Sequence, residues 1–286
     1  MQVSVTLSHS QRFKYHFYSM QMYGILILCF LILMMSVGPY ISTYHYDQMH
    51  LAAKNHAPSW NFWFGTDDLG RDIFVRTCYG ARISFCIAIA TVCIDLFLGI
   101  FVGSLAGLAN PKVDECVMRL LDILYSIPTL LTAILLSVFF GSGLLSIVIA
   151  VNVISWITMA RIVRGQILLL KEMDFILAVR SLGANSSYIL LKHLLPNTWG
   201  PIMVTLTMTI PSAIFSEAFL SFLGLGIQAP MASWGTMAYE GLPALQYYPW
   251  RLFFPAAFIS LTMLSFYLIG EGLKKTFNSS YSENIL

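Results

Sequence analysis

The stretch ISFCIAIATVCIDLFLGIFVGSLAGL, residues 83–108, decides the fold class, because it is long, apolar and interrupted by a single charged side chain, that of Asp95. A helix needs about 20 mostly apolar residues to cross the hydrocarbon core of a bilayer. Lipid offers the backbone no hydrogen-bond partner, so the segment has to satisfy its own N–H and C=O groups. Residues 83–108 therefore predict a transmembrane helix.

Further stretches of the chain have the same character. They are residues 21–40, 120–140, 144–159, 201–222 and 252–269. We therefore expect an all-α integral membrane protein with about six transmembrane helices. No small-residue cleavage site follows the first stretch, which we interpret as an uncleaved anchor.

The composition supports a membrane protein and excludes several other classes. Of 286 residues, 57% are hydrophobic and 10% are charged, whereas a soluble domain has roughly 25% charged residues. The net charge of +2 provides no basic surface for nucleic acid, so we expect no nucleic-acid partner. The cysteines have no metal-ligand spacing and are expected to be small buried hydrophobes, so we expect no metal site.

The Lys and Arg residues favour a cytoplasmic N-terminus, because most of them then fall on the cytoplasmic side. The exceptions are Lys54, Arg71, Arg76, Arg82 and Arg251. The expected organisation has five parts. They are a cytoplasmic N-terminal segment at 1–20, a first transmembrane helix at 21–40, an external loop at 41–82, a five-helix core at 83–273 and a cytoplasmic tail at 274–286.

A patterned cytoplasmic loop is expected at 161–200, and it contains LAVRSLGANSSYILLKHLLPN at 177–197. Two short helices are predicted there. Gly183 suits the end of the first, because a left-handed residue at a helix C-terminus is easiest for glycine. Asn185 or Ser186 can cap the second, and Pro196 is expected to end it.

Each predicted short helix has an apolar face. The stripe on the first consists of Phe175, Ala178, Val179 and Leu182, and the face of the second consists of Tyr188, Leu191 and Leu195. Two interpretations stay open on the residues alone. The faces pack against the protein's own helices, or they dock a cytoplasmic partner.

Gly183 followed by HLLPN at 193–197 resembles the coupling-loop motif of binding-protein-dependent ABC importer permeases, in the HxLPN form of the dipeptide and oligopeptide branch. The Glu-Ala-Ala that opens the family motif is replaced here by Leu177, Ala178 and Val179. Three further stretches resemble the same branch in the same order. They are FGTDDLGRDIFVRTCYGARIS at 64–84, VDECVMRLLDILYSIPTLLTAILL at 113–136 and EAFLSFLGLGIQAPMASWGTMAYEG at 217–241.

The resemblance implies the permease fold of type I ABC importers and a C-type permease subunit of the cytoplasmic (inner) membrane, which moves solute by alternating access. It implies two cytoplasmic ATPase subunits, a second homologous permease subunit and an external solute-binding protein. Di- or oligopeptides are the expected cargo, although the branch also includes permeases for metal chelates and some sugars. The motif assigns an ATPase-docking role to Ala178, Arg180, Gly183, Ala184, Asn185, His193, Pro196 and Asn197.

The chain has no GxxxxGK[ST] sequence, so it has no loop of that kind to bind nucleotide phosphates. We therefore expect no catalytic residue, no cofactor in this chain and no enzymatic activity of its own. ATP and Mg are expected in the partner ATPase subunits.

Two acidic residues within the expected spans are candidate pore or gating residues, since a charge at a helix centre costs at least about 2.5 to 3.5 kcal/mol. Asp95 either contacts solute or is hydrogen-bonded in the core. Glu217 either holds a helix break at Gly224 and Gly226 or lines and gates the route. Asp122 is expected to form an ordinary ion pair with Arg119.

Small residues and prolines suggest helix contacts and bends. Gly99, Gly103 and Gly107 form a groove for a neighbouring helix, either in another subunit or in this one. Pro128 and Pro211 are candidate kinks.

Two other classes of membrane protein fit the sequence less well. An ion-coupled secondary transporter or channel would also be helical and apolar, but the chain shows no convincing internal repeat and the patterned loop would go unexplained. A membrane-embedded enzyme is disfavoured because no HExxH motif or acid-paired His lies within a span.

Overall fold

The computed structural model describes residues 9–141 and 143–283, and its regular elements in this part of the chain are helices. The long helices are α1 (His9–Ile41), α2 (Ile73–Leu108), α3 (Pro111–Ser126), α4 (Thr129–Phe140), α5 (Leu144–Leu170), α8 (Leu195–Leu220) and α10 (Trp250–Glu283). The short ones are η1 (Leu51–Ala53), α6 (Asp174–Ser181), α7 (Ser186–Ile189), η2 (Leu190–Leu194), η3 (Ser221–Leu225), α9 (Trp234–Gly241) and η4 (Leu242–Ala244).

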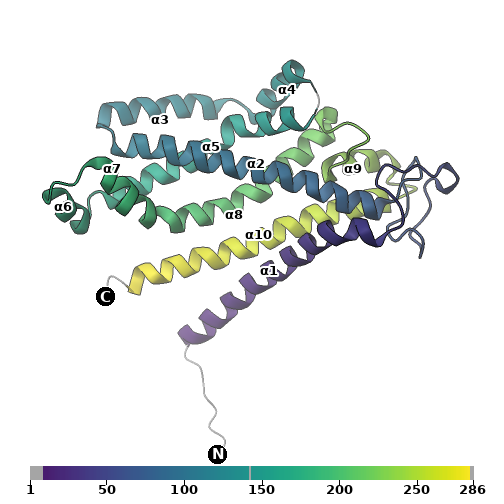
Figure 1. The fold of residues 1–286 in the computed structure, drawn as a ribbon, viewed down its shortest axis with the longest axis horizontal. Coiled ribbons are helices and arrows are strands. Elements are labelled where there is room, and N and C mark those ends of the chain that lie inside the picture. Colours follow the sequence, from purple (N-terminus) through teal and green to yellow (C-terminus); the bar gives the residue numbers. More distant parts are fainter. Residues whose placement is uncertain (1–8, 142, 284–286) are drawn as a thin grey trace, which may run out of the picture.

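The long helices form an elongated bundle (Figure 1). Helices α2, α5 and α8 pack against one another in the middle, and α1 packs along α10 on one flank. Helices α6 and α7 lie at one end of the bundle, and α9 with residues 42–72 lies at the opposite end. The bundle thus separates two exposed ends by the length of its apolar helices.

The expected all-α membrane fold is confirmed. Five helices are long and apolar enough to cross a membrane, and the bent pair α3 and α4 would supply a sixth span. The bend between them is 79°, and it occurs at Pro128, which directly precedes α4. Pro128 therefore breaks the expected span 120–140, whereas α8 continues through Pro211.

Two helices extend well beyond their predicted bounds, because their charged residues are paired. Helix α2 begins at Ile73, so residues 73–82 do not belong to the external loop expected at 41–82. Arg76 is 1% exposed and lies 3.1 Å from a carboxylate oxygen of Glu240. Hydropathy alone scores Arg76 as an isolated charge, whereas in the structure the carboxylates of Asp67 and Glu240 lie within ion-pair distance of its guanidinium group.

Helix α5 likewise continues past residue 159 to Leu170. Arg164 donates two hydrogen bonds to the Asp114 carboxylate, at 2.5 and 2.6 Å. Arg161 lies 2.7 Å from Asp122, so the expected pair of Asp122 with Arg119 is wrong. Arg119 instead pairs along its own helix with Glu115. The ion pairs from α5 therefore hold α3 against it.

The cysteines differ in their exposure. Cys78 is buried, whereas Cys29, Cys86, Cys93 and Cys116 are exposed on the isolated chain. The expectation of small buried residues is therefore wrong for most of them. An apolar residue of a membrane helix also satisfies its environment by facing lipid, so apolar surroundings in the sequence do not imply burial within the chain.

The glycine groove on α2 packs within this subunit. A Cβ atom at Gly99 would lie 2.5 Å from Cβ of Met159, and one at Gly103 would lie 2.5 Å from the carbonyl oxygen of Ala160. At Gly107 it would lie 2.8 Å from Ile167. The close approach of α5 therefore explains the glycines. This is the interpretation in which the groove packs against a helix of the same subunit.

Glu217 is hydrogen-bonded to residues on both sides of the break at the end of α8. Its carboxyl group is 0% exposed and accepts hydrogen bonds from Ser84 (3.0 Å), Ser221 (2.8 Å) and Ser233 (2.6 Å). Ser84 lies on α2, Ser221 is the first residue of η3, and Ser233 caps α9. Gly224 within the break has a left-handed backbone with φ +80°, which favours glycine.

Replacing Gly103 with Leu is expected to disrupt the α2–α5 contact. The added side chain would collide with backbone as well as with Val163, and overpacking costs about 1–3 kcal/mol or more. Thermal unfolding of the purified protein in detergent measures the loss. Gly165→Ala is the matched control, since a Cβ there meets nothing within 4 Å; an unfolding midpoint for Gly103→Leu equal to that of Gly165→Ala would contradict the packing.

Replacing Glu217 with Ala is expected to lower the free energy of unfolding by about 1–3 kcal/mol, because buried hydroxyl groups lose their acceptor. Glu217→Gln keeps one oxygen and should lose less. The readout is again the unfolding midpoint, with the neighbouring Ser216→Ala as control. A Glu217→Ala protein as stable as the control would show that the carboxyl group does not hold the break.

Candidate functional site

The turn between α6 and α7 has the local geometry that the sequence predicts. Gly183 adopts φ +85°, and a Cβ atom there would meet no other atom within 4 Å, so the backbone conformation rather than crowding accounts for the glycine. The side-chain oxygen of Asn185 accepts a hydrogen bond from the backbone N–H of Tyr188 at 2.7 Å. Asn185 is therefore the N-cap of α7.

The boundaries of this loop differ from the expected 161–200. The first residues of the expected loop belong to α5, and α7 runs through the π-helical turn η2 into α8. The connection between these two long helical segments is therefore shorter, at 171–185, and it contains α6. Pro196 was expected to end a helix, and this is wrong. Pro196 is the second residue of α8, inside the continuous helical run from Ser186. It cannot donate a backbone hydrogen bond there, and the π-helical turn η2 directly before it accommodates the proline without ending the run.

We call residues 171–197 the elbow. On one side it is anchored in the bundle, because Ile176, Ile189 and Leu194 are buried in a cluster with Val163 and Ile167 of α5. Other apolar side chains of the elbow are exposed. Leu182 is 87% exposed and Leu191 is 67% exposed.

The other candidate docking residues lie around this exposed surface. Ala178, Arg180, Pro196 and Asn197 are exposed, whereas Ala184 and His193 are half-buried. The side chain of Asn197 donates a hydrogen bond to the carbonyl oxygen of His193 at 2.7 Å, and the ring of His193 contacts Tyr188 edge-on. The structure thus brings the predicted residues together in one elbow at one end of the bundle.

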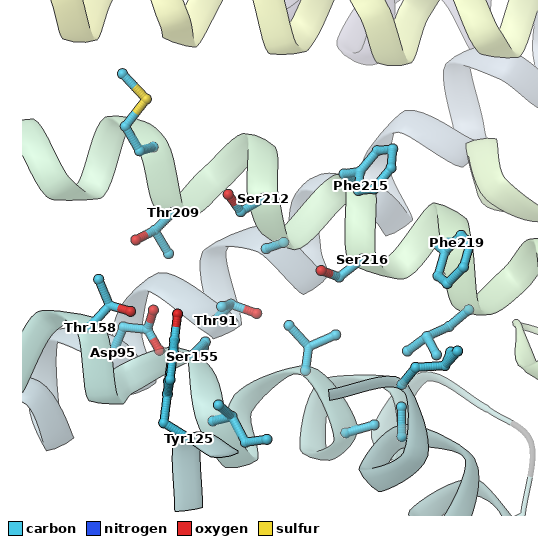
Figure 2. A pocket seen from close by; sticks show the side chains of 18 of the residues that line it. Thr91, Asp95, Tyr125, Ser155, Thr158, Thr209, Ser212, Phe215, Ser216 and Phe219 are labelled. Atoms are coloured by element: carbon cyan, nitrogen blue, oxygen red, sulfur yellow. Dashed lines mark hydrogen bonds between the residues drawn. The ribbon is translucent and has the colours of Figure 1, made fainter. Parts of the chain in front are cut away.

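A cavity of about 460 Å³ lies between α2, α3, α4, α5 and α8. Figure 2 shows polar side chains from several of these helices directed into it. Asp95 lines it, is 2% exposed and accepts a hydrogen bond from Ser155 at 2.6 Å. Besides Asp95 and Ser155, the polar lining residues are Thr91, Tyr125, Thr158, Thr205, Thr209, Ser212 and Ser216.

The candidate pore and gating residues separate into two places. Asp95 lines the cavity, whereas Glu217, Gly224 and Gly226 lie at the break that leads to α9. Sequence analysis did not identify the hydroxyl groups of the cavity. A signal was present on α8, where Thr205, Thr209, Ser212 and Ser216 are spaced to share one helix face.

A buried ion-pair network at the opposite end of the bundle was also missed. Arg71 donates to Asp67 at 2.6 Å, and both Arg71 and Arg76 lie within ion-pair distance of Glu240 on α9. Arg251 of α10 pairs with Asp68 at 3.3 Å. The network fastens the segment before α2 to α9 and α10.

The sequence comparisons agree with the motifs. Residues 99–282 match the model of the family described as binding-protein-dependent transport system inner membrane component. The chain is 51% identical over 271 residues to the oligopeptide transport system permease protein OppC of Bacillus subtilis (strain 168), covering 95% of this chain and 89% of that protein. It is 50% identical over 254 residues to the dipeptide transport system permease protein DppC of the same organism, covering 88% and 79%.

The fold is also found in a solved structure. A chain of the MetNI methionine ABC transporter, in an inward-facing conformation, superposes with a TM-score of 0.57 at 19% identity, covering 69% of this chain and 94% of that chain. At this identity the match concerns the fold alone. Together with the family match, it shows that the chain belongs to the binding-protein-dependent transport system inner membrane components, the permease family of ABC importers.

Proposed function

We propose that this chain is the C-type permease subunit of an importer for short peptides, which it moves across the cytoplasmic membrane together with a second homologous permease subunit. The observation that carries the proposal is the elbow, whose exposed apolar face stands at the end of an otherwise membrane-spanning bundle. The peptide cargo is supported by the 51% and 50% identity to oligopeptide and dipeptide permeases.

The elbow end of the bundle faces the cytoplasm in this proposal, and the termini lie on the same side. Arg180 and Lys192 lie on the elbow, and Lys112 and Arg119 lie on the segment that starts α3, as the excess of positive residues on cytoplasmic segments requires. The network around Arg71 and Arg76 then lies on the outer side. Its positive charges are compensated by Asp67 and Glu240.

Two cytoplasmic ATPase subunits drive the transport, and an external binding protein delivers the solute. One ATPase grips the exposed face of the elbow. Because Ile176 and Ile189 anchor the elbow in the packing of α5 and α8, closure of the ATPases moves these helices with it as a rigid body. Both helices form walls of the cavity, so nucleotide-driven closure changes the shape of the route.

Replacing Leu182 with Glu tests the docking face. Burial of a leucine contributes about 1.5–3 kcal/mol, so the variant is expected to bind the ATPase at least about tenfold more weakly. Titration of the ATPase onto the purified permease measures the affinity. Leu245→Glu is the control, because Leu245 is also exposed but lies after α9, at the other end; equal affinity of the two variants would exclude Leu182 from the interface.

Reconstituted transport tests the function as a whole. Proteoliposomes that contain both permease subunits and the ATPase subunits are expected to accumulate labelled trialanine, and uptake should require ATP and added binding protein. Omission of the ATPase subunits is the control and should abolish uptake. Accumulation by the permease subunits alone would contradict an ATP-driven importer and favour an ion-coupled transporter.

A further inference from the structure

Asp95 presents an unpaired carboxylate to the cavity. Ser155 donates a hydrogen bond to its Oδ1 atom at 2.6 Å. Within residues 20–128, 130–141 and 143–277, no other side chain donates to this carboxyl group, and no Lys, Arg or His pairs with it. A carboxylate within a membrane helix costs free energy unless a cation or hydrogen-bond donor lies beside it. The second oxygen of Asp95 is therefore suited to a cationic or hydrogen-bonding occupant of the cavity.

The surroundings of Asp95 suit one kind of cation. Figure 2 shows Asp95, Tyr125, Ser155, Thr158 and Thr209 toward one end of the cavity, and Phe215 and Phe219 toward the other. No Lys, Arg or His is found among the described residues that line it. A primary ammonium group has three N–H donors, and the Asp95 carboxylate and the nearby threonine hydroxyl oxygens offer acceptors for them.

We propose that Asp95 is the acceptor for the primary ammonium group of a solute in transit, which for a short peptide is its N-terminus. This inference rests on the proposed function for the identity of the solute. An ammonium group that leaves water for the membrane loses its hydration, and the carboxylate offsets that loss through a charge-assisted hydrogen bond. The end of the cavity lined by Phe215 and Phe219 then faces the apolar part of the solute.

The alternative is that Asp95 has a structural role and only fastens α2 to α5 through Ser155. The two roles depend on different properties of Asp95. An ammonium site needs its negative charge, and a structural role needs its hydrogen bond with Ser155. Asp95→Asn removes the charge. Ser155→Ala removes the hydrogen-bond donor and keeps the charge.

The first experiment measures the charge in the cavity and needs no partner protein. A cysteine at Thr209, in a chain whose native cysteines are replaced by alanine, is treated with a cationic ethylammonium thiosulfonate and with an anionic ethylsulfonate thiosulfonate. Asp95→Asn is expected to lower the cationic-to-anionic ratio of reaction rates at least about tenfold, and Ser155→Ala should retain the ratio. An unchanged ratio in Asp95→Asn would overturn the inference.

The second experiment measures trialanine uptake by the complete importer, with the second permease subunit, the ATPases and the binding protein present. Asp95→Asn is expected to slow uptake about tenfold. Glu115→Gln is the matched control, because it neutralises an exposed carboxylate that pairs with Arg119 outside the cavity, and it should transport at the wild-type rate. Uptake by Asp95→Asn at that same rate would overturn the ammonium site.

The two experiments separate the failure of this inference from the failure of the proposed function. If the wild-type complex takes up no trialanine, the peptide-import function fails, and the reagent ratio still tests the site. If the wild type imports trialanine and Asp95→Asn does so equally well, peptide import stands and the ammonium site fails. A loss of uptake in Ser155→Ala as large as that in Asp95→Asn would assign the effect to the hydrogen bond and overturn the site.

Discussion

A bilayer supplies no partner for a charge or a buried polar group, and this constraint decides where the helices of this chain are joined. The guanidinium groups of Arg161 and Arg164 on α5 form ion pairs with carboxylates on α3. The carboxyl group of Glu217 on α8 is met by serines from three other places in the chain. Loss of the Glu217 carboxyl group would leave buried hydroxyl groups without their acceptor, at a cost of about 1–3 kcal/mol. These contacts therefore help to fix the arrangement of the helices.

Helices α2 and α5 form one rigid unit through close backbone packing. The glycines of α2 bring its backbone against α5, and closely packed helices transmit displacement rather than absorb it. The elbow is attached to this unit through the cluster around Val163 and Ile167. Asp95 and Ser155 face each other across the α2–α5 contact in the wall of the cavity, so under the proposed function a displacement of the elbow would move the wall that carries them.

The sequence predicted the features that depend on consecutive residues. The apolar spans, the left-handed turn at Gly183 and the cap at Asn185 are of this kind. The predicted helix ends near Arg76 and Arg164 were wrong, because hydropathy scores each charge as if it were alone. The partner of Arg76 is Glu240 and that of Arg164 is Asp114, and both partners are distant in the sequence. The cavity was missed for a related reason, since separate helices contribute its polar groups.

The chemistry of the cavity is consistent with a route for solutes of varied shape. Peptides of different sequence share an N-terminal ammonium group and differ in their side chains, so a route that admits many of them can recognise only what they share. A single carboxylate among neutral hydroxyls provides such recognition, and the aromatic end places no hydrogen-bonding demand on the side chains. A site that conducts must also release its occupant. Hydroxyl groups bind an ammonium group more weakly than a second carboxylate would, so in the proposed site one charge at the cavity wall would attract the solute without trapping it.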